Sequence, residues 1–176
     1  YAYPWAGGAD DTCDIYVDID WAGCTRTRRS TSGGAVLWHG HAIKHWATTQ
    51  ATVALASAEA ELIGIVKGVA QGMGLKSIAA DLGLPLDIVV HTDSSAAKGI
   101  VQRTGIGRVR HLEVSLSWVQ DHLQRKTFTI VKGPGIDNPA DMLTKHVEGA
   151  VIDKHSAEIG VTFPVGRAQS APKLGQ

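Results

Sequence analysis

The stretch "YVDIDWAG", residues 16–23, places Asp18 and Asp20 in a short apolar run that ends at a Trp-Ala-Gly turn. From residue 14 to residue 20 polar and apolar side chains alternate, which predicts a β-strand with the acids on one face and Val17 with the isoleucines on the other. An ionised carboxylate on a strand that also feeds a core is costly unless a partner offsets its charge. We therefore expect this strand to belong to a sheet and its acids to face a site that compensates them.

Composition limits the classes of protein to which the chain can belong. Its 176 residues are 44% hydrophobic, which suits one domain with a substantial core. Lysine and arginine balance aspartate and glutamate at 17 each, so nucleic-acid contacts would have to come from local patches. Two cysteines without metal-ligand spacing predict reduced thiols. Neither a membrane-length apolar run nor a signal-peptide pattern is present, so we expect an intracellular protein of the cytoplasm, nucleus or a virus-like particle, without membrane contact.

Two further strands are expected before the first helix. Small, hydroxyl and basic residues follow the first strand and predict a loop. Two short β-prone runs then flank Gly40 and His41, a pattern typical of a hairpin. The first three strands are therefore predicted to be antiparallel.

The hydrophobic period changes at Ser57. Apolar residues recur at intervals of three and four, which predicts an amphipathic helix to about residue 71. Gly72 and Gly74 are expected to interrupt it before a second short helix that Gly83 ends.

The remaining chain predicts two more strands and three more helices. "LDIVVHTD", residues 86–93, is typical of a buried strand, and "SSAAKGIVQ" starts a helix from a serine cap. A long helix follows over 112–123, then the strand "KTFTIVKG", then a helix capped by Asn138 with Pro139 at its first position. This order predicts an α/β protein whose mixed sheet carries helices on both faces.

Four carboxylates occupy special places in this topology. A parallel crossover would put the strand that ends at Asp93 beside the strand of Asp18, and helical Glu61 and Asp141 could approach from one face. Like charges so close repel strongly unless cations bind them, and oxygen ligands favour Mg²⁺ or Mn²⁺. Two such ions about 4 Å apart support in-line phosphoryl displacement. The four acids thus predict phosphodiester hydrolysis.

Five motifs in unbroken order resemble the ribonuclease H domain of copia-type retrotransposon polyproteins: "YVDIDWAG", "RRSTSG", "ASAEAELIGI", "VHTDSSAA" and "NPADMLTK". The resemblance covers about residues 14–146. It implies a ribonuclease H-like fold with a five-stranded mixed sheet, and cleavage of the RNA strand of RNA–DNA hybrids with two Mg²⁺ ions, for which Mn²⁺ could substitute. It also implies that catalysis and metal binding fall to Asp18, Glu61, Asp93 and Asp141.

The same reading divides the chain into three parts. Residues 1–13 are expected to be an N-terminal extension and 14–146 the catalytic domain. Because Gly, Ala and Pro increase and periodicity fades beyond Val147, residues 147–176 are predicted to be a weakly ordered tail.

Two features depart from the family pattern. Relatives place a catalytic histidine in the loop before the last acid, whereas "KGPGIDNP" contains none, and His91 is the nearest candidate by pattern. No long basic insertion follows the first helices either, so hybrid binding must depend on other residues.

Alternatives remain for individual acids. Asp20 shares the face of Asp18 and competes with it, and Glu59 competes with Glu61, although a solvated helix face is the favoured interpretation of Glu59. Asp93 could instead cap the following helix, and Asp141 could simply complement a helix dipole.

Candidate substrate contacts are hydroxyl and basic residues suited to phosphate oxygens. One group lies in the loop after the first strand, one opens the helix after Asp93, and one precedes the long helix, where backbone amides favour anions. These candidates are Arg28, Arg29, Ser30, Thr31, Ser94, Ser95, Arg108 and Arg110.

The sequence thus predicts an RNA–DNA hybrid endoribonuclease, with a reverse transcriptase domain in a parent polyprotein as an expected partner. Two alternatives stay open: a non-catalytic connection-type domain that only grips hybrid, and an integrase-like nuclease or transferase on the same fold. Integrase-like enzymes normally use three acids, so the presence of a fourth, Asp141, argues against this alternative.

Overall fold

A computed structural model describes residues 11–105 and 112–161. Five strands form one sheet in the order β3-β2-β1-β4-β5. β1 pairs antiparallel with β2 and β2 with β3, whereas β1 and β4, and β4 and β5, are parallel. The strands are β1 (Thr12–Asp20), β2 (Thr31–Trp38), β3 (His41–Thr49), β4 (Asp87–Thr92) and β5 (Thr129–Lys132). The predicted five-stranded mixed sheet is confirmed.

β1 is the central strand, and it has the predicted alternation. Ile15 and Val17 are fully buried on the face that packs against α1 (Ser57–Asp81), as is Cys13 at the start of the strand. Cys13 and Cys24 are both free thiols. The opposite face of β1 carries the acids.

The hairpin between β2 and β3 turns at His39 and Gly40, both of which have positive φ angles of 50° and 74°. Such angles suit the two-residue turns that match the twist of a hairpin. The predicted hairpin is confirmed.

α1 is one helix of 25 residues, so the predicted break at Gly72 and Gly74 is wrong. Gly64, Gly68 and Gly72 are spaced by four and face the sheet. A Cβ atom on Gly68 would lie 2.7 Å from Val17 Cγ1, and one on Gly72 would lie 2.4 Å from Ile15 Cδ1. These glycines therefore let the helix approach the sheet closely and do not end it.

Two more helices cover the same face of the sheet as α1. α2 (Ser95–Gln102) starts from Ser94, whose Oγ accepts the Ala97 N–H at 3.2 Å, as the sequence predicts. α3 (Glu113–Gln124) contributes the buried Leu116 and Val119. No helix within the described ranges is long and apolar enough to cross a bilayer.

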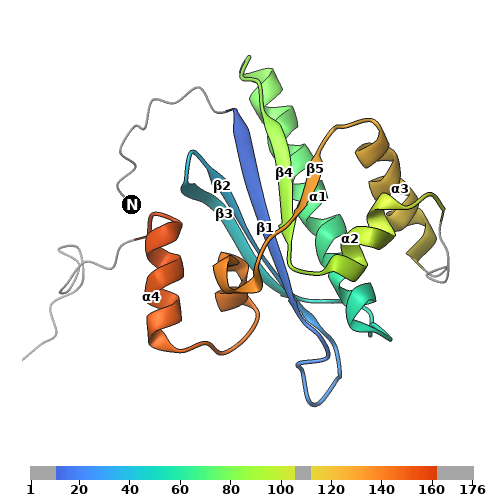
Figure 1. Cartoon of the computed structure of the whole chain (residues 1–176), viewed down its shortest axis with the longest axis vertical. Coiled ribbons are helices and arrows are strands. Elements are labelled where there is room, and N and C mark those ends of the chain that lie inside the picture. The colour runs from blue at the N-terminus through green and yellow to red at the C-terminus, as the bar shows by residue number, and fades with distance from the viewer. Residues whose placement is uncertain (1–10, 106–111, 162–176) are drawn as a thin grey trace, which may run out of the picture.

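The other face of the sheet is covered by two short 3-10 helices, η2 (Gly135–Asp137) and η3 (Pro139–Leu143), and by α4 (Gly149–Glu158). Figure 1 shows η3 and α4 on the side of β1 opposite α1. Helices on both faces are thus confirmed. The helix predicted from Asn138 is the single short turn η3, which ends at Leu143.

The prediction of a weakly ordered tail from residue 147 is wrong for α4. Ile159, just after this helix, packs with Ala35 and Leu37 of β2 and is 6% exposed. Periodicity fades in the sequence because α4 itself buries only His155 and Ser156, and it is Ile159 that completes a second small core. Residues 162–176 of the predicted tail lie outside the described residues.

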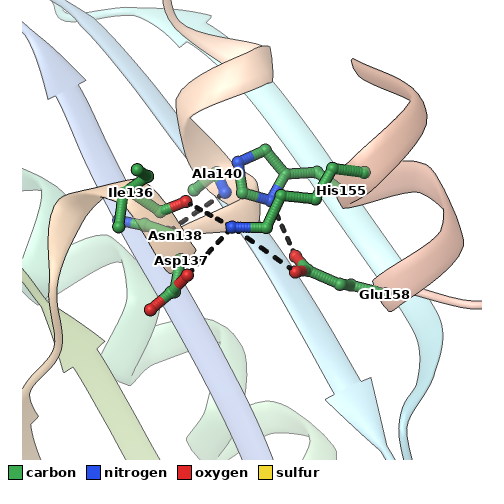
Figure 2. A network of polar contacts seen from close by, with 7 residues as sticks. Ile136, Asp137, Asn138, Ala140, His155 and Glu158 are labelled. Carbon is green, nitrogen blue, oxygen red and sulfur yellow. Dashed lines mark hydrogen bonds and ion pairs between the residues drawn. The ribbon is translucent and has the colours of Figure 1, made fainter. Parts of the chain in front are cut away.

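Polar contacts also tie α4 to the segment that precedes η3 (Figure 2). Lys154 Nζ donates to the carbonyl oxygen of Ile136 at 3.0 Å and lies 2.9 Å from Asp137 Oδ1. Buried His155 is 2.8 Å from Glu158 through Nδ1. α4 therefore holds the chain that leads to Asp141.

Candidate active site

Asp18 lies on the face of β1 away from α1 and is almost completely buried. Thr144 donates a hydrogen bond from Oγ1 to its carboxylate, and Lys145 Nζ lies 3.6 Å from Asp18 Oδ2. Burial raises the pKa of Asp18, the Thr144 bond and the Lys145 charge oppose this, and Asp141 adds to the increase. The net pKa is above its ordinary value, because burial removes water that would stabilise the charge.

Glu61 approaches from the first turns of α1. Its Oε2 atom is buried and has no hydrogen-bond partner. Burial, and then the charges of Asp93 and Asp18, raise its pKa to about 8. A buried oxygen without a donor is unfavourable, so this atom marks a place where a cation would be stabilised.

Asp93 follows β4 directly, at the end of the sheet where parallel β1 also ends. Gly135 lies against it, since a Cβ atom there would be 3.1 Å from Asp93 Oδ2. A cavity of about 150 Å³ opens beside Asp93 and is also lined by His91 and Asn138. Asp93 is therefore reachable from outside.

Asp141 lies in η3, and Asn138 fixes that helix. The Asn138 amide donates to the Val17 carbonyl oxygen at 2.9 Å, and its Oδ1 accepts the Ala140 N–H at 3.1 Å. Pro139 follows the cap at the first helical position, as predicted. One side chain thus caps η3 and binds it to β1, which brings Asp141 beside Asp18.

The four predicted acids lie within electrostatic range of one another, since the charges of Asp93, Asp18 and Asp141 each raise the pKa of Glu61. They come from β1, α1, the end of β4 and η3. Figure 1 shows α1 starting near the end of the sheet at which β1 and β4 finish.

The two competing acids lie elsewhere. Asp20 lines a cavity that it shares with Lys145 but not with Asp93, and its carboxylate lies over Gly23. Glu59 is buried and accepts the Leu55 N–H at 2.9 Å. The expectation of a solvated Glu59 is therefore wrong, because this carboxylate fixes the loop that enters α1.

Lys145 is a member of the cluster that sequence reasoning missed. Its Nζ is 2.8 Å from Asp141 Oδ1 as well as close to Asp18. Partial burial lowers its pKa, but the bond to Asp141 and the charges of Asp18 and Asp93 outweigh this and hold it above its ordinary value. The signal was available, because a basic residue four positions after an acid favours pairing on a helical turn.

The cluster suits Mg²⁺ or Mn²⁺ in its chemistry. All the donors are carboxylate oxygens, and one of them, on Glu61, is buried without a partner. Even so, no three His, Cys, Asp or Glu side chains in residues 11–105 and 112–161 converge tightly enough to form a finished metal site. The residue types therefore fit the ions, while Lys145 contacts two of the acids directly.

The predicted substrate contacts after β1 fall into two groups. Arg28 and Arg29 are exposed on the loop that extends from the end of β1. Thr31 is half-buried at the start of β2. Ser30 is fully buried and accepts the Ala22 N–H at 3.1 Å, so its predicted contact with substrate is wrong because its hydroxyl fixes the loop.

The other predicted contacts lie near α2 and the chain before α3. Ser95 is exposed, whereas the hydroxyl of Ser94 caps α2. Arg108 and Arg110 lie outside the described residues.

His91, the candidate substitute for the histidine missing from the loop before Asp141, is restrained by two contacts. Its Nε2 is 2.7 Å from Asp14 Oδ1, and its ring stacks on Tyr16 at 4.5 Å between centroids. It lines the same cavity as Asp93. The structure thus places His91 next to the cluster but already paired.

Comparison with known proteins agrees with this geometry. No family model matches the chain. Over 143 residues, 80% of the chain, it is 32% identical to the retrovirus-related Pol polyprotein from transposon TNT 1-94 of Nicotiana tabacum. Over 149 residues it is 27% identical to the corresponding polyprotein from transposon RE2 of Arabidopsis thaliana. The chain is a relative of the copia-type retrotransposon Pol polyproteins. It spans about a tenth of their length, 11% and 10% respectively.

Solved structures identify the fold of this copia-type relative. LC11-RNase H1, isolated from compost by a metagenomic approach, superposes with a TM-score of 0.60 at 16% identity. The match covers 82% of this chain and 98% of LC11-RNase H1. The same enzyme in complex with an RNA/DNA hybrid gives a TM-score of 0.53 at 17% identity, covering 81% and 97%. The ribonuclease H fold of the copia-type relative is therefore confirmed.

Proposed function

We propose that this chain is a metal-dependent endoribonuclease that hydrolyses the RNA strand of RNA–DNA hybrids. The observation that carries the proposal is that four carboxylates from separate segments, Asp18, Glu61, Asp93 and Asp141, lie within electrostatic range of one another, with Glu61 Oε2 buried and unpaired. A nonfunctional cluster of this kind would cost stability, because the Asp18 carboxylate and Glu61 Oε2 are buried away from water. Kinship with Pol polyproteins and the solved hybrid complex of LC11-RNase H1 support the choice of substrate.

Two Mg²⁺ ions, or Mn²⁺ in their place, would be held by these four acids, and when bound they would supply Lewis-acid activation of water and stabilisation of the leaving oxygen. We expect that Asp18 and Asp93 would contribute to holding both ions, and Glu61 and Asp141 to holding one each. The protein's own task is to hold these oxygens in place before substrate arrives. Thr144 and Asn138 do so for Asp18 and the η3 segment.

Substrate binding is assigned to basic and hydroxyl residues. Arg28 and Arg29 would contact the phosphates of the hybrid backbone, with Thr31, Ser95, Arg108 and Arg110 as further candidates. Selection of RNA would depend on 2′-hydroxyl contacts in the minor groove and not on base edges. Cleavage should accordingly be independent of sequence.

The expected context is a longer polyprotein. We infer that residues 14–146 are the ribonuclease H-like unit, extended by α4, and that a reverse transcriptase domain of the parent protein shares the hybrid substrate. The short match to Pol polyproteins of much greater length supports this context.

The test is cleavage of labelled RNA–DNA hybrid, RNA duplex and DNA duplex by the purified chain, with Mg²⁺ or Mn²⁺ and with chelator. We expect cleavage of the hybrid alone, abolished by chelator and reduced by about a thousandfold or more in Asp93→Asn. Asp20→Asn is the matched control, because Asp20 lies on the same strand face as Asp18 but outside the cluster, and it should retain most activity. Cleavage of all three duplexes would indicate a general nuclease, and hybrid binding without cleavage a connection-type domain; either outcome contradicts the proposal.

A further inference from the structure

Lys145 pairs with two carboxylates of the acidic cluster. Its ammonium group contacts Asp141 at 2.8 Å and Asp18 at 3.6 Å, two acids that come from opposite ends of the described chain. Both are among the carboxylates assigned above to the metal ions. The ammonium thus lies against oxygens that an incoming divalent ion would require.

The Lys145 side chain has room to move away from Asp18 and Asp141. Its side chain is 43% exposed, in contrast to the 2% exposure of the Asp18 side chain. It also lines an open cavity of about 480 Å³, together with Asp20, His146 and Ile152. The lysine stem can therefore rotate into open space, whereas Asp18 is fixed by Thr144 and by the strand.

The acidic cluster needs a counter-charge when no metal ion is bound. Four carboxylates without a cation would repel one another, and an ammonium between two of them reduces that repulsion. A tethered charge does so without the loss of freedom that capture of a free ion requires. It also opposes the binding of any second cation at the same oxygens.

We propose that Lys145 is a built-in counter-ion that stabilises the empty acidic cluster and competes with one divalent cation for Asp18 and Asp141, moving into the neighbouring cavity when that ion binds. This inference rests on the proposed function for the identity of the ion. It adds that the affinity for metal is limited by the chain's own lysine.

The experiment compares Mn²⁺ binding by the wild-type chain, Lys145→Met and Lys76→Met at one fixed salt concentration, with free Mn²⁺ measured by electron paramagnetic resonance. Lys76 is the matched control, because it also lies 3.6 Å from a carboxylate, that of Asp87 at the far end of β4. Lys145→Gln, which keeps a hydrogen-bond donor but no charge, serves if the methionine variant fails to fold. A second readout is the melting temperature of each variant with and without Mn²⁺.

We expect Lys145→Met and Lys145→Gln to bind Mn²⁺ about tenfold more tightly than wild type, because a nearby repulsive charge is removed. Without metal their melting temperatures should fall, and saturating Mn²⁺ should raise them by more than it raises that of wild type. Lys76→Met should match wild type in Mn²⁺ affinity. Equal or weaker binding by both Lys145 variants would overturn the inference.

Failure of the inference and failure of the proposed function give different results. Tighter Mn²⁺ binding by the Lys145 variants, with no hybrid cleavage by wild type, would leave the counter-ion role standing and overturn the nuclease activity. Hybrid cleavage by wild type with unchanged Mn²⁺ affinity in the variants would support the nuclease activity and overturn the counter-ion role. Absence of Mn²⁺ binding in every variant would overturn both.

Discussion

The side-chain amide of Asn138 donates a hydrogen bond to the backbone carbonyl of Val17, at 2.9 Å and across 121 positions of sequence. Val17 precedes Asp18, and Asn138 caps the helix that carries Asp141. A single buried side chain therefore sets the spacing between the first and the last acid of the cluster.

Asn138→Ala should lower the free energy of unfolding by about 2–3 kcal/mol, because it removes the cap and leaves the Val17 carbonyl without its donor. Asn138→Asp separates the two roles, since aspartate can still accept the Ala140 N–H but cannot donate to Val17 while ionised. Urea denaturation of both variants measures the effect. Equal stability of Asn138→Asp and wild type at neutral pH would contradict the role of the bond to Val17.

Gly68→Ala should destabilise the protein by about 1–3 kcal/mol, because the new methyl group would overlap Val17 and push α1 from the sheet. Gly74→Ala is its matched control on the same helix. Gly74 is exposed, and a Cβ atom there would meet nothing within 4 Å. That change should stabilise the protein by about 0.5–1 kcal/mol through helix propensity. Thermal unfolding of both variants distinguishes packing from propensity, and similar effects at the two positions would refute the close approach.

The metal-free protein should lose stability as pH rises. Glu61 has a pKa of about 8 in the folded state against an ordinary value of 4.5. Between pH 4.5 and pH 8 the folded protein therefore keeps a proton on Glu61 that the unfolded chain has released. The stabilisation that Glu61 contributes is complete below pH 4.5 and is lost as pH rises through 8. Burial shifts the pKa of Asp18 in the same direction.

Glu61→Gln should flatten this pH dependence, and at pH 9 it should be more stable than wild type in chelator by on the order of 2 kcal/mol. Glu148→Gln, at an exposed position, controls for the general loss of a carboxylate. The measurement is the free energy of unfolding from urea titrations between pH 5 and pH 9. A wild-type profile that rises across this range would contradict the proposed environment of Glu61.

Ile159→Ala should cost about 2–4 kcal/mol, because its side chain is 6% exposed and packs on β2. Ile152→Ala in α4 removes the same atoms from a side chain that is 39% exposed, and it should cost less. Chemical denaturation compares the two. Equal small losses would mean that α4 adds nothing to the domain's stability.

The sequence was sufficient to predict the sheet, but not the contacts that surround the acids. Alternation in β1 is a local pattern, and the strand-helix-strand order that leads to β4 predicts parallel pairing, so Asp18 in β1 and Asp93 just after β4 were expected at the same end of the sheet. The predicted break in α1 was wrong because the glycines of this helix are required by the sheet against which it packs. No local sequence pattern distinguishes a glycine that allows close packing from one that ends a helix.

The same limit explains Lys145, Glu59 and Ser30. Each has a role set by a tertiary contact. Lys145 pairs with Asp18 in a strand at the other end of the chain, Glu59 accepts a backbone N–H before α1, and Ser30 accepts a loop N–H after β1. Ser30 and Glu59 look like surface residues in the sequence, because polar side chains that satisfy buried backbone groups have the composition of a loop.

The Asn138 bond has a consequence for the order of events during synthesis. Asp18 leaves the ribosome before Thr144 and Asn138, which hold its surroundings and are made more than a hundred residues later. Long-range contacts of this kind form late and slow the folding of a chain. A nascent polypeptide therefore carries Asp18 without an assembled centre until η3 has been made, and the cluster is completed only when η3 docks against β1.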